Sequence, residues 1–185
     1  IRDGCIEIFK KDSAGELLNG WTVTVHRDDG TYKERVGQTG TDGKGRVLIC
    51  GLPMGAYTVT ETPQAWYRAD RKVGPSQPAT LRTPGSTISL TFVNEPLGCI
   101  DGYKIDYLNR GLGDWEVIAT NGLTGDRYAT VTNALGYFYF PDLPFGPYTI
   151  EEVVKDRWSA VTAPAQQVNV VQRGPTCVPV RFKNI

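Results

Sequence analysis

The chain has 185 residues, a formal net charge of zero, and 40% hydrophobic and 10% aromatic residues, so it is long enough for one large or two small folded domains and is not disordered. The lack of a basic surplus argues against binding to duplex nucleic acid, and no apolar run approaches the roughly 20 residues of a membrane span. A single histidine argues against a histidine-based metal site or catalytic triad.

Short segments of alternating polarity follow one another along the chain, and turn-forming residues separate them. The first half predicts the strands Cys5–Lys10, Trp21–His26, Arg46–Ile49, Ala56–Glu61 and Ser86–Asn94. The second half predicts Cys99–Ile105, Trp115–Thr120, Tyr137–Phe140, Pro147–Val153 and Pro175–Asn184. No segment has a 3.6-residue hydrophobic period, and short strands at this spacing are typical of a β-sandwich.

The two halves of the chain are similar in sequence, and the matching motifs occur in the same order. The matches are Gly4–Ile6 with Gly98–Ile100, Trp21 with Trp115, Leu52–Glu61 with Leu143–Glu152, and Phe92–Asn94 with Phe182–Asn184. They predict two tandem copies of one domain, residues 1–96 and 97–185. The connection around Pro96 is too short for free tumbling, so we expect the two sandwiches to lie end to end.

Strand alternation places three polar residues of each half in rows that otherwise face the core. These residues are Lys10, Glu61 and Asn94 in the first half, and Lys104, Glu152 and Asn184 in the second. For any one of them, the simpler interpretation is a strand end in solvent, because lysine and glutamate are almost always exposed. The match between the halves favours a functional role, because a strand end does not require the same polar residue type.

Buried together, these residue types have a specific chemistry. Burial lowers the pKa of a lysine and makes its amine nucleophilic, and a buried carboxyl can relay a proton. A neighbouring carboxamide is an electrophile with ammonia as its leaving group. The pattern therefore indicates an amide exchange that joins lysine and asparagine side chains.

The chain resembles a known family at these residues. The order Ile-x-Ile-x-Lys-x-Asp, Gly-Leu-Pro-x-Gly-x-Tyr-Thr-Val-x-Glu and Phe-Val-Asn is similar to the collagen-adhesin B-type (Cna-B, SpaA-like, prealbumin-like) domains of bacterial surface adhesins and pilins. The resemblance covers both halves and implies two seven-stranded sandwiches of the reverse-immunoglobulin type, with first and last strands parallel and adjacent. It also implies spontaneous isopeptide bonds Lys10–Asn94 and Lys104–Asn184, promoted by Glu61 and Glu152 from the other sheet.

Four cysteines, none spaced as Cys-x-x-Cys, favour disulfides and an extracellular protein over zinc or redox motifs. In the fold that the resemblance implies, Cys99 and Cys177 lie on neighbouring strands with both side chains on the outer face. The strand that ends at Cys50 flanks the one that begins at Cys5. We therefore expect Cys5–Cys50 and Cys99–Cys177, with free thiols as the alternative.

The sequence has no phosphate loop, nucleotide fingerprint or nucleophile–base set, and its acidic loops lack the pattern of a calcium site. We expect no cofactor, no metal and no turnover enzyme. The favoured function is a structural stalk or shaft module of an exported bacterial surface protein, whose partners are other copies or domains of that protein.

Two alternatives remain at this stage. One is a subunit of an extracellular filament that assembles end to end. The other is a module that binds carbohydrate or a host matrix protein through the loops of Trp66 and Trp158, although packing over a sandwich end is the simpler interpretation of both rings. The ends of the chain resemble its internal junction, which favours a longer tandem array over a trimmed two-domain protein.

Overall fold

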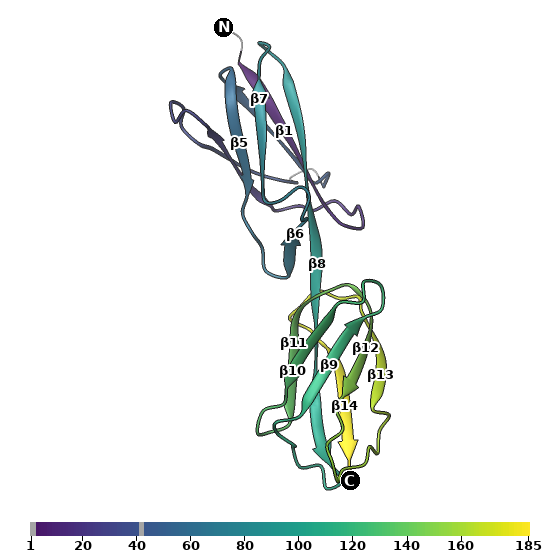
Figure 1. The fold of residues 1–185 in the computed structure, drawn as a ribbon. Coiled ribbons are helices and arrows are strands. Elements are labelled where there is room, and N and C mark those ends of the chain that lie inside the picture. Colours follow the sequence, from purple (N-terminus) through teal and green to yellow (C-terminus); the bar gives the residue numbers. More distant parts are fainter. Residues whose placement is uncertain (1–2, 41–42) are drawn as a thin grey trace. The chain divides into compact units, whose positions relative to one another are not determined.

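The computed structural model describes residues 3–40 and 43–185, and these residues form strands joined by turns and loops, without a helix (Figure 1). The strands are β1 (Gly4–Asp12), β2 (Thr22–Arg27), β3 (Arg35–Gln38), β4 (Arg46–Leu52), β5 (Gly55–Glu61), β6 (Tyr67–Ala69), β7 (Ser76–Leu81), β8 (Thr87–Asp106), β9 (Glu116–Asn121), β10 (Arg127–Val131), β11 (Tyr137–Pro144), β12 (Gly146–Glu152), β13 (Ala165–Val170) and β14 (Val178–Asn184). The all-β class predicted from the sequence is confirmed. Within the described ranges, the chain has no helix that could cross a membrane.

The chain divides into two compact units, Ile1–Pro96 (unit 1) and Leu97–Ile185 (unit 2). The division falls inside β8, which contributes its first part to unit 1 and its second part to unit 2. The sequence predicted two strands and a connecting link here, and the structure has one unbroken strand instead. Pro96 is compatible with this strand because its fixed φ suits extended backbone.

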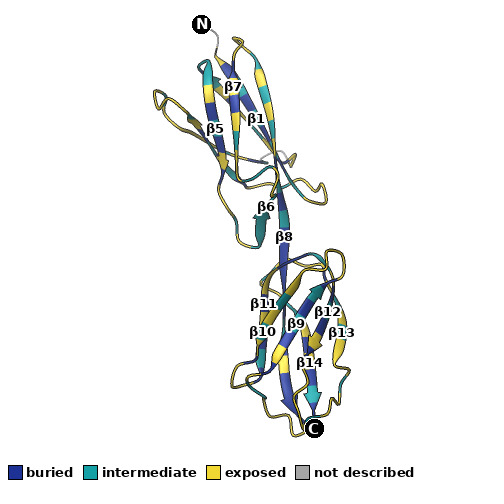
Figure 2. Cartoon of the chain, in the orientation of Figure 1, coloured by how far each residue is buried: buried dark blue, intermediate teal, exposed yellow. Residues whose placement is uncertain are grey.

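Unit 1 contains two sheets. In one, β1 lies between β4, which is antiparallel to it, and β8, which is parallel to it. The other has the antiparallel order β3-β2-β5-β7. Alternate residues of β1 are buried, so Ile6 and Ile8 pack in a core with Val23 and Val59 of the second sheet (Figure 2).

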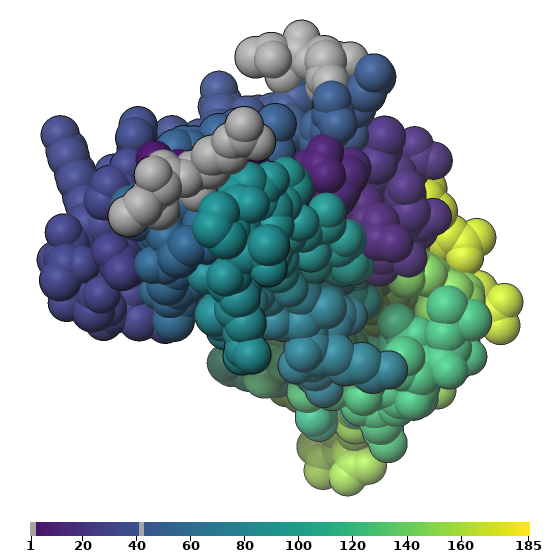
Figure 3. Space-filling model, turned by 90° about the horizontal axis from the view of Figure 1, so that it is seen from above, coloured from purple at the N-terminus to yellow at the C-terminus, as the bar shows by residue number. Residues whose placement is uncertain are grey.

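The start of β1 is fixed beside the turn that leads into β8. The backbone N–H of Cys5 donates to the carbonyl of Ser86 at 2.9 Å. The space-filling view shows the same arrangement, with the purple start of β1 against the teal turn (Figure 3). The parallel pairing of β1 with β8 therefore begins next to this hydrogen bond.

Unit 2 has the same arrangement of strands. Its first sheet has the order β11-β8-β14, with β8 antiparallel to β11 and parallel to β14. Its second sheet has the order β10-β9-β12-β13. The core between them contains Ile100, Val117, Phe138, Ile150 and Phe182.

Five strands of the described structure were not predicted from the sequence. They are β3, β6, β7, β10 and β13. Each of them lies at an edge of its sheet, and none has more than two buried residues. Edge strands have few buried positions, so their sequences carry little alternation of polarity.

Candidate functional site

Lys10 lies in the core of unit 1. It follows Ile6 and Ile8 on the inward face of β1, and its side chain has no exposed surface. Its Nζ donates to Oδ1 of Asn94 at 2.5 Å and lies 3.0 Å from Oε2 of Glu61. The lysine, the asparagine and the glutamate that the sequence singled out in unit 1 are therefore in contact.

Three strands bring these side chains together. In the parallel pairing of β1 with β8, Lys10 is opposite Phe92, and Asn94 follows two residues later on the same face. Glu61 ends β5 in the opposite sheet, where it pairs with Val23 of β2. Its carboxyl group therefore reaches the lysine across the core rather than along the sheet.

Burial dominates the electrostatics of this site. Desolvation lowers the pKa of Lys10 below its ordinary value, and the hydrogen bond and charge of Glu61 oppose this shift only in part. The amine of Lys10 is therefore easier to deprotonate than that of an exposed lysine. A neutral amine has the free electron pair that a nucleophile needs.

Unit 2 repeats the lysine–glutamate contact of this arrangement, but not the hydrogen bond from the lysine to the asparagine. Lys104 is opposite Phe182 in the pairing of β8 with β14, and its Nζ lies 2.9 Å from Oε2 of Glu152. Desolvation also lowers the pKa of Lys104. Asn184 is fully buried, and its side-chain amide has no hydrogen bond within the part of the chain that the structure describes. A buried amide without a partner requires a specific explanation.

Each lysine also lies over an indole ring. Lys10 Nζ is 4.2 Å from the ring centroid of Trp21, and Lys104 Nζ is 4.5 Å from that of Trp115. Both tryptophans are buried in the cores, and each of them also contacts a lysine. The sequence contains one signal of this contact, because the tryptophans recur in the second half at the same offset as the lysines.

A second aromatic ring meets each of these indoles edge-on. Tyr67 contacts Trp21 with centroids 5.2 Å apart, and Trp158 contacts Trp115 at 5.5 Å. The structural counterpart of Trp158 is thus Tyr67 and not Trp66, although both tryptophans follow a strand that ends in a buried glutamate. Trp66 instead corresponds to Arg157, and both residues have a left-handed backbone with φ of 63° and 68°.

Gly102 replaces Ile8 of the first unit, and the structure shows what fills the space. Phe138 lies opposite Gly102 on β11, whereas Val47 lies opposite Ile8 on β4. A Cβ atom on Gly102 would lie 2.7 Å from Cζ of Phe138. The large ring thus takes the volume of the missing side chain, and Lys104 is as deeply buried as Lys10.

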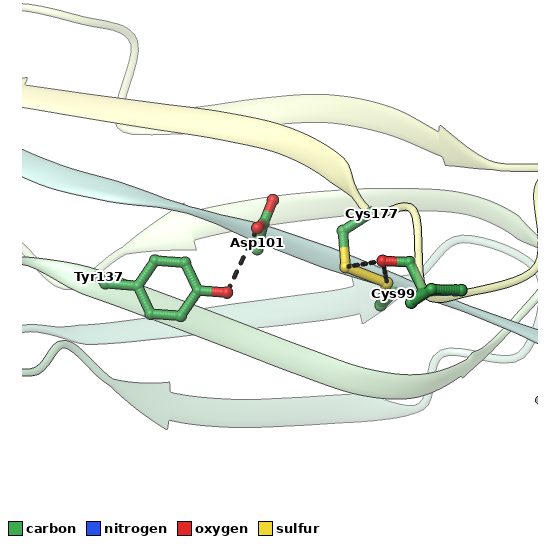
Figure 4. The surroundings of a disulfide bond; sticks show 5 residues. Cys99, Asp101, Tyr137 and Cys177 are labelled. Carbon is green, nitrogen blue, oxygen red and sulfur yellow. Dashed lines mark hydrogen bonds between the residues drawn. A yellow bond between two sulfur atoms is a disulfide. The ribbon is translucent and has the colours of Figure 1, made fainter.

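Both cysteine pairs form disulfides, and the pairings are those expected from the sequence. Cys5 on β1 bonds to Cys50, its direct cross-strand neighbour on β4. Cys99 on β8 bonds to Cys177 just before β14, on the same face as Asp101 (Figure 4). The carbonyl of Pro175 lies close to both sulfur atoms, and Cys99 is buried although it is on the outer face.

The described residues contain no cluster of three or more His, Cys, Asp or Glu side chains that could hold a metal ion. The buried charged groups of the described residues include the two lysine–glutamate pairs. In unit 1 the pair is in contact with Asn94, and in unit 2 Asn184 is buried on β14, the strand that pairs with the one carrying Lys104. The arrangement provides an amine, a carboxamide and a proton-relaying carboxyl, which are the groups of an amide exchange.

The model of the SpaA prealbumin-like fold domain family matches residues 4–96, which is half of the chain. The chain therefore belongs to this family. None of the curated protein sequences matches it.

Several solved structures are similar to the chain. The TIE protein of Bacillus anthracis is 24% identical, with a TM-score of 0.50 over 99% of this chain and 34% of its own. A streptococcal ancillary pilin is 17% identical, with a TM-score of 0.46 and coverage of 99% and 62%. The shaft pilin SpaA of Lactobacillus rhamnosus GG is 14% identical, with a TM-score of 0.39 and coverage of 98% and 97%. This chain spans about a third of the TIE protein, and at this identity the similarity shows the fold alone.

Proposed function

We propose that this chain is a structural module of an exported bacterial surface protein, a stalk or pilus-like shaft, built from two copies of the family's seven-stranded domain. Residues 1–96 form one copy and residues 97–185 the other. Each copy is locked by an isopeptide bond, Lys10–Asn94 or Lys104–Asn184. The observation that carries the proposal is the buried contact of Lys10 Nζ with Asn94 at 2.5 Å and with Glu61 at 3.0 Å.

The bond forms in one turnover and consumes its own residues. The neutral amine of Lys10 attacks the side-chain carbonyl carbon of Asn94, and the new C–N bond forms as the C–N bond to the amide nitrogen breaks. Glu61 takes the proton from the attacking amine and delivers it to the leaving nitrogen, which departs as ammonia. Glu152 has the same role toward Lys104 and Asn184. The module is therefore not a turnover enzyme and uses no cofactor.

The position of the cross-links suits a load-bearing role. Each one joins two parallel neighbouring strands, β1 with β8 in unit 1 and β8 with β14 in unit 2. Such a bond prevents these strands from separating and restricts the unfolded chain, as a disulfide does. The disulfides favour an extracellular location, on the cell surface or in a filament. The partners are other domains or copies of the same surface protein.

Intact mass under reducing conditions tests the proposal. The folded protein is expected to weigh less than its sequence by two ammonia molecules. Glu61→Gln and Glu152→Gln should each restore one of them, and the double variant should have the full sequence mass. Glu7→Gln, at an outward-facing position of β1, is the matched control and should leave both bonds intact. Full sequence mass in well-folded wild-type protein would refute the cross-links.

A further inference from the structure

The outer face of the β11-β8-β14 sheet carries an organised set of side chains outside the cross-link site. The strand register aligns them in two rows that cross all three strands. One row is Arg181, Tyr103 and Tyr137, and the other is Pro179, Asp101 and Tyr139. These six residues are called the tyrosine face below.

The same positions of unit 1 have a different composition. The rows there are Thr91, Phe9 and Arg46, and Ser89, Glu7 and Leu48. Arg46 forms an ion pair with Glu7 at 2.8 Å, and Ser89 donates to the same carboxylate at 3.2 Å. The polar groups of that face thus satisfy one another, so unit 1 provides a comparison surface within the same chain.

The polar groups of the tyrosine face can form hydrogen bonds beyond those they already make. The hydroxyl of Tyr137 donates to Oδ2 of Asp101 at 3.3 Å, beside the disulfide (Figure 4). The guanidinium of Arg181 has no hydrogen bond or ion pair with any residue that the structure describes. Tyr103 packs against Tyr137 with ring centroids 5.3 Å apart, yet 44% of its surface is exposed.

Two hollows lie on either side of the Tyr103 and Arg181 side chains. One, of about 380 Å³, also involves Asp101 and Pro179. The other, of about 260 Å³, also involves Asn109 and Leu135. A ligand that occupies both hollows would therefore cover the tyrosine ring and reach acceptor and donor groups at once.

We propose that the tyrosine face binds a neutral saccharide. A sugar ring has an apolar face that can stack on Tyr103, and its hydroxyls both donate and accept, so they can satisfy Asp101 and Arg181 together. One carboxylate and one guanidinium give the face no net charge, which favours a neutral ligand over an acidic one. A peptide strand could pair only with the outer edges of β11 or β14 and not over Tyr103, because β8 is already paired on both sides.

An array of immobilised neutral oligosaccharides, including glucose, galactose and N-acetylglucosamine oligomers, tests the proposal with the intact 185-residue chain. The bound compound is then titrated in solution. Tyr103→Ala and Arg181→Ala should each weaken binding about tenfold, the usual scale for losing one aromatic or charged contact. Tyr103→Phe should retain most of the affinity because it keeps the ring.

The matched controls are Phe9→Ala and Thr91→Ala at the corresponding positions of unit 1, which should leave binding unchanged. Because Arg181 is exposed, Arg181→Ala decides the question even where Tyr103→Ala fails to fold. Three results would overturn the proposal. They are no binding up to about 1 mM saccharide, equal affinity in wild type and Arg181→Ala, and preferential binding of acidic oligosaccharides or of peptides.

Discussion

The amine of Lys10 lies 4.2 Å from the ring centroid of Trp21, whose indole is itself 1% exposed. The ring covers the amine and keeps water from it, while its electron-rich face attracts the charged form. Desolvation is the larger influence on Lys10, so its pKa is lowered. We therefore expect Trp21 to affect the proposed reaction of the lysine as well as to fill the core.

Replacement of Trp21 by alanine is expected to slow cross-link formation in unit 1. The substitution opens space beside Lys10, water enters, and the pKa of the amine returns toward its ordinary value. In protein refolded from inclusion bodies, the loss of ammonia followed by intact mass should be slower at about pH 7, and less so at about pH 9, where more of the amine is neutral.

Two variants control this experiment. Trp21→Phe keeps a ring over the amine and should react faster than Trp21→Ala. Trp66→Ala, in the loop before β6, should react like wild type. A delay in Trp21→Ala that is the same at both pH values would indicate a folding defect rather than a change at the amine.

A protein that cannot form the cross-links should become more stable as the pH rises. In Asn94→Ala/Asn184→Ala, both lysines keep free amines with pKa values lowered by burial. Between those lowered values and the ordinary value of 10.5, the unfolded state binds more protons than the folded state, so the free energy of unfolding rises with pH. Below the lowered values both states are protonated and the slope vanishes.

Denaturant unfolding between about pH 7 and about pH 10 measures this slope. The wild-type protein provides the reference, because lysines joined by the proposed cross-links would not titrate. Buried tyrosines, such as Tyr57, whose pKa is raised by desolvation, titrate alike in both proteins and cancel in the comparison. Equal slopes in the variant and the wild type would contradict the prediction.

Strand faces could be predicted from the sequence because side chains alternate with a strict period of two and the chain repeats itself. This was enough to place Lys10, Glu61 and Asn94 in inward-facing rows on three strands. The proximity of Lys10 to Trp21 could not be predicted in this way. It depends on how two separate sheets pack, which alternation within one strand does not specify.

The sequence also could not show that the ring of Phe138 fills the space beside Gly102. A glycine in an inward-facing row indicates a loosened core when its cross-strand neighbour is unknown. Trp66 and Trp158 look equivalent in the sequence because each follows a glutamate-bearing strand, but they do not occupy equivalent backbone positions. The left-handed backbone shared by Trp66 and Arg157 gives the correct alignment.

Gly102→Ala is expected to destabilise unit 2. The new Cβ would lie 1.8 Å from the carbonyl oxygen of Val180, so the backbone of β14 would have to move. Overpacking of this kind costs about 1–3 kcal/mol, which thermal or denaturant unfolding can measure. Gly122→Ala is the control, because its nearest contact of 3.3 Å is far less severe. Equal stability of the two variants would show that β14 adapts without strain.

The disulfide and the proposed isopeptide bond of unit 2 should stabilise the protein redundantly. Cys99–Cys177 closes a loop with a sequence separation of 78, and the proposed Lys104–Asn184 bond would join β8 to β14 a few residues further along. Once one bond is present, the other removes little additional entropy from the unfolded chain. Cys99→Ser/Cys177→Ser should therefore cost well under 1 kcal/mol in wild type but about 2–4 kcal/mol in Asn184→Ala.

In unit 1, Cys5–Cys50 ties β1 to β4, whereas Lys10–Asn94 ties β1 to β8, so the corresponding double-mutant cycle should be close to additive. The unfolding free energies of both cycles, measured side by side, test this difference, and additive behaviour in unit 2 would show that its two bonds do not constrain the same loop.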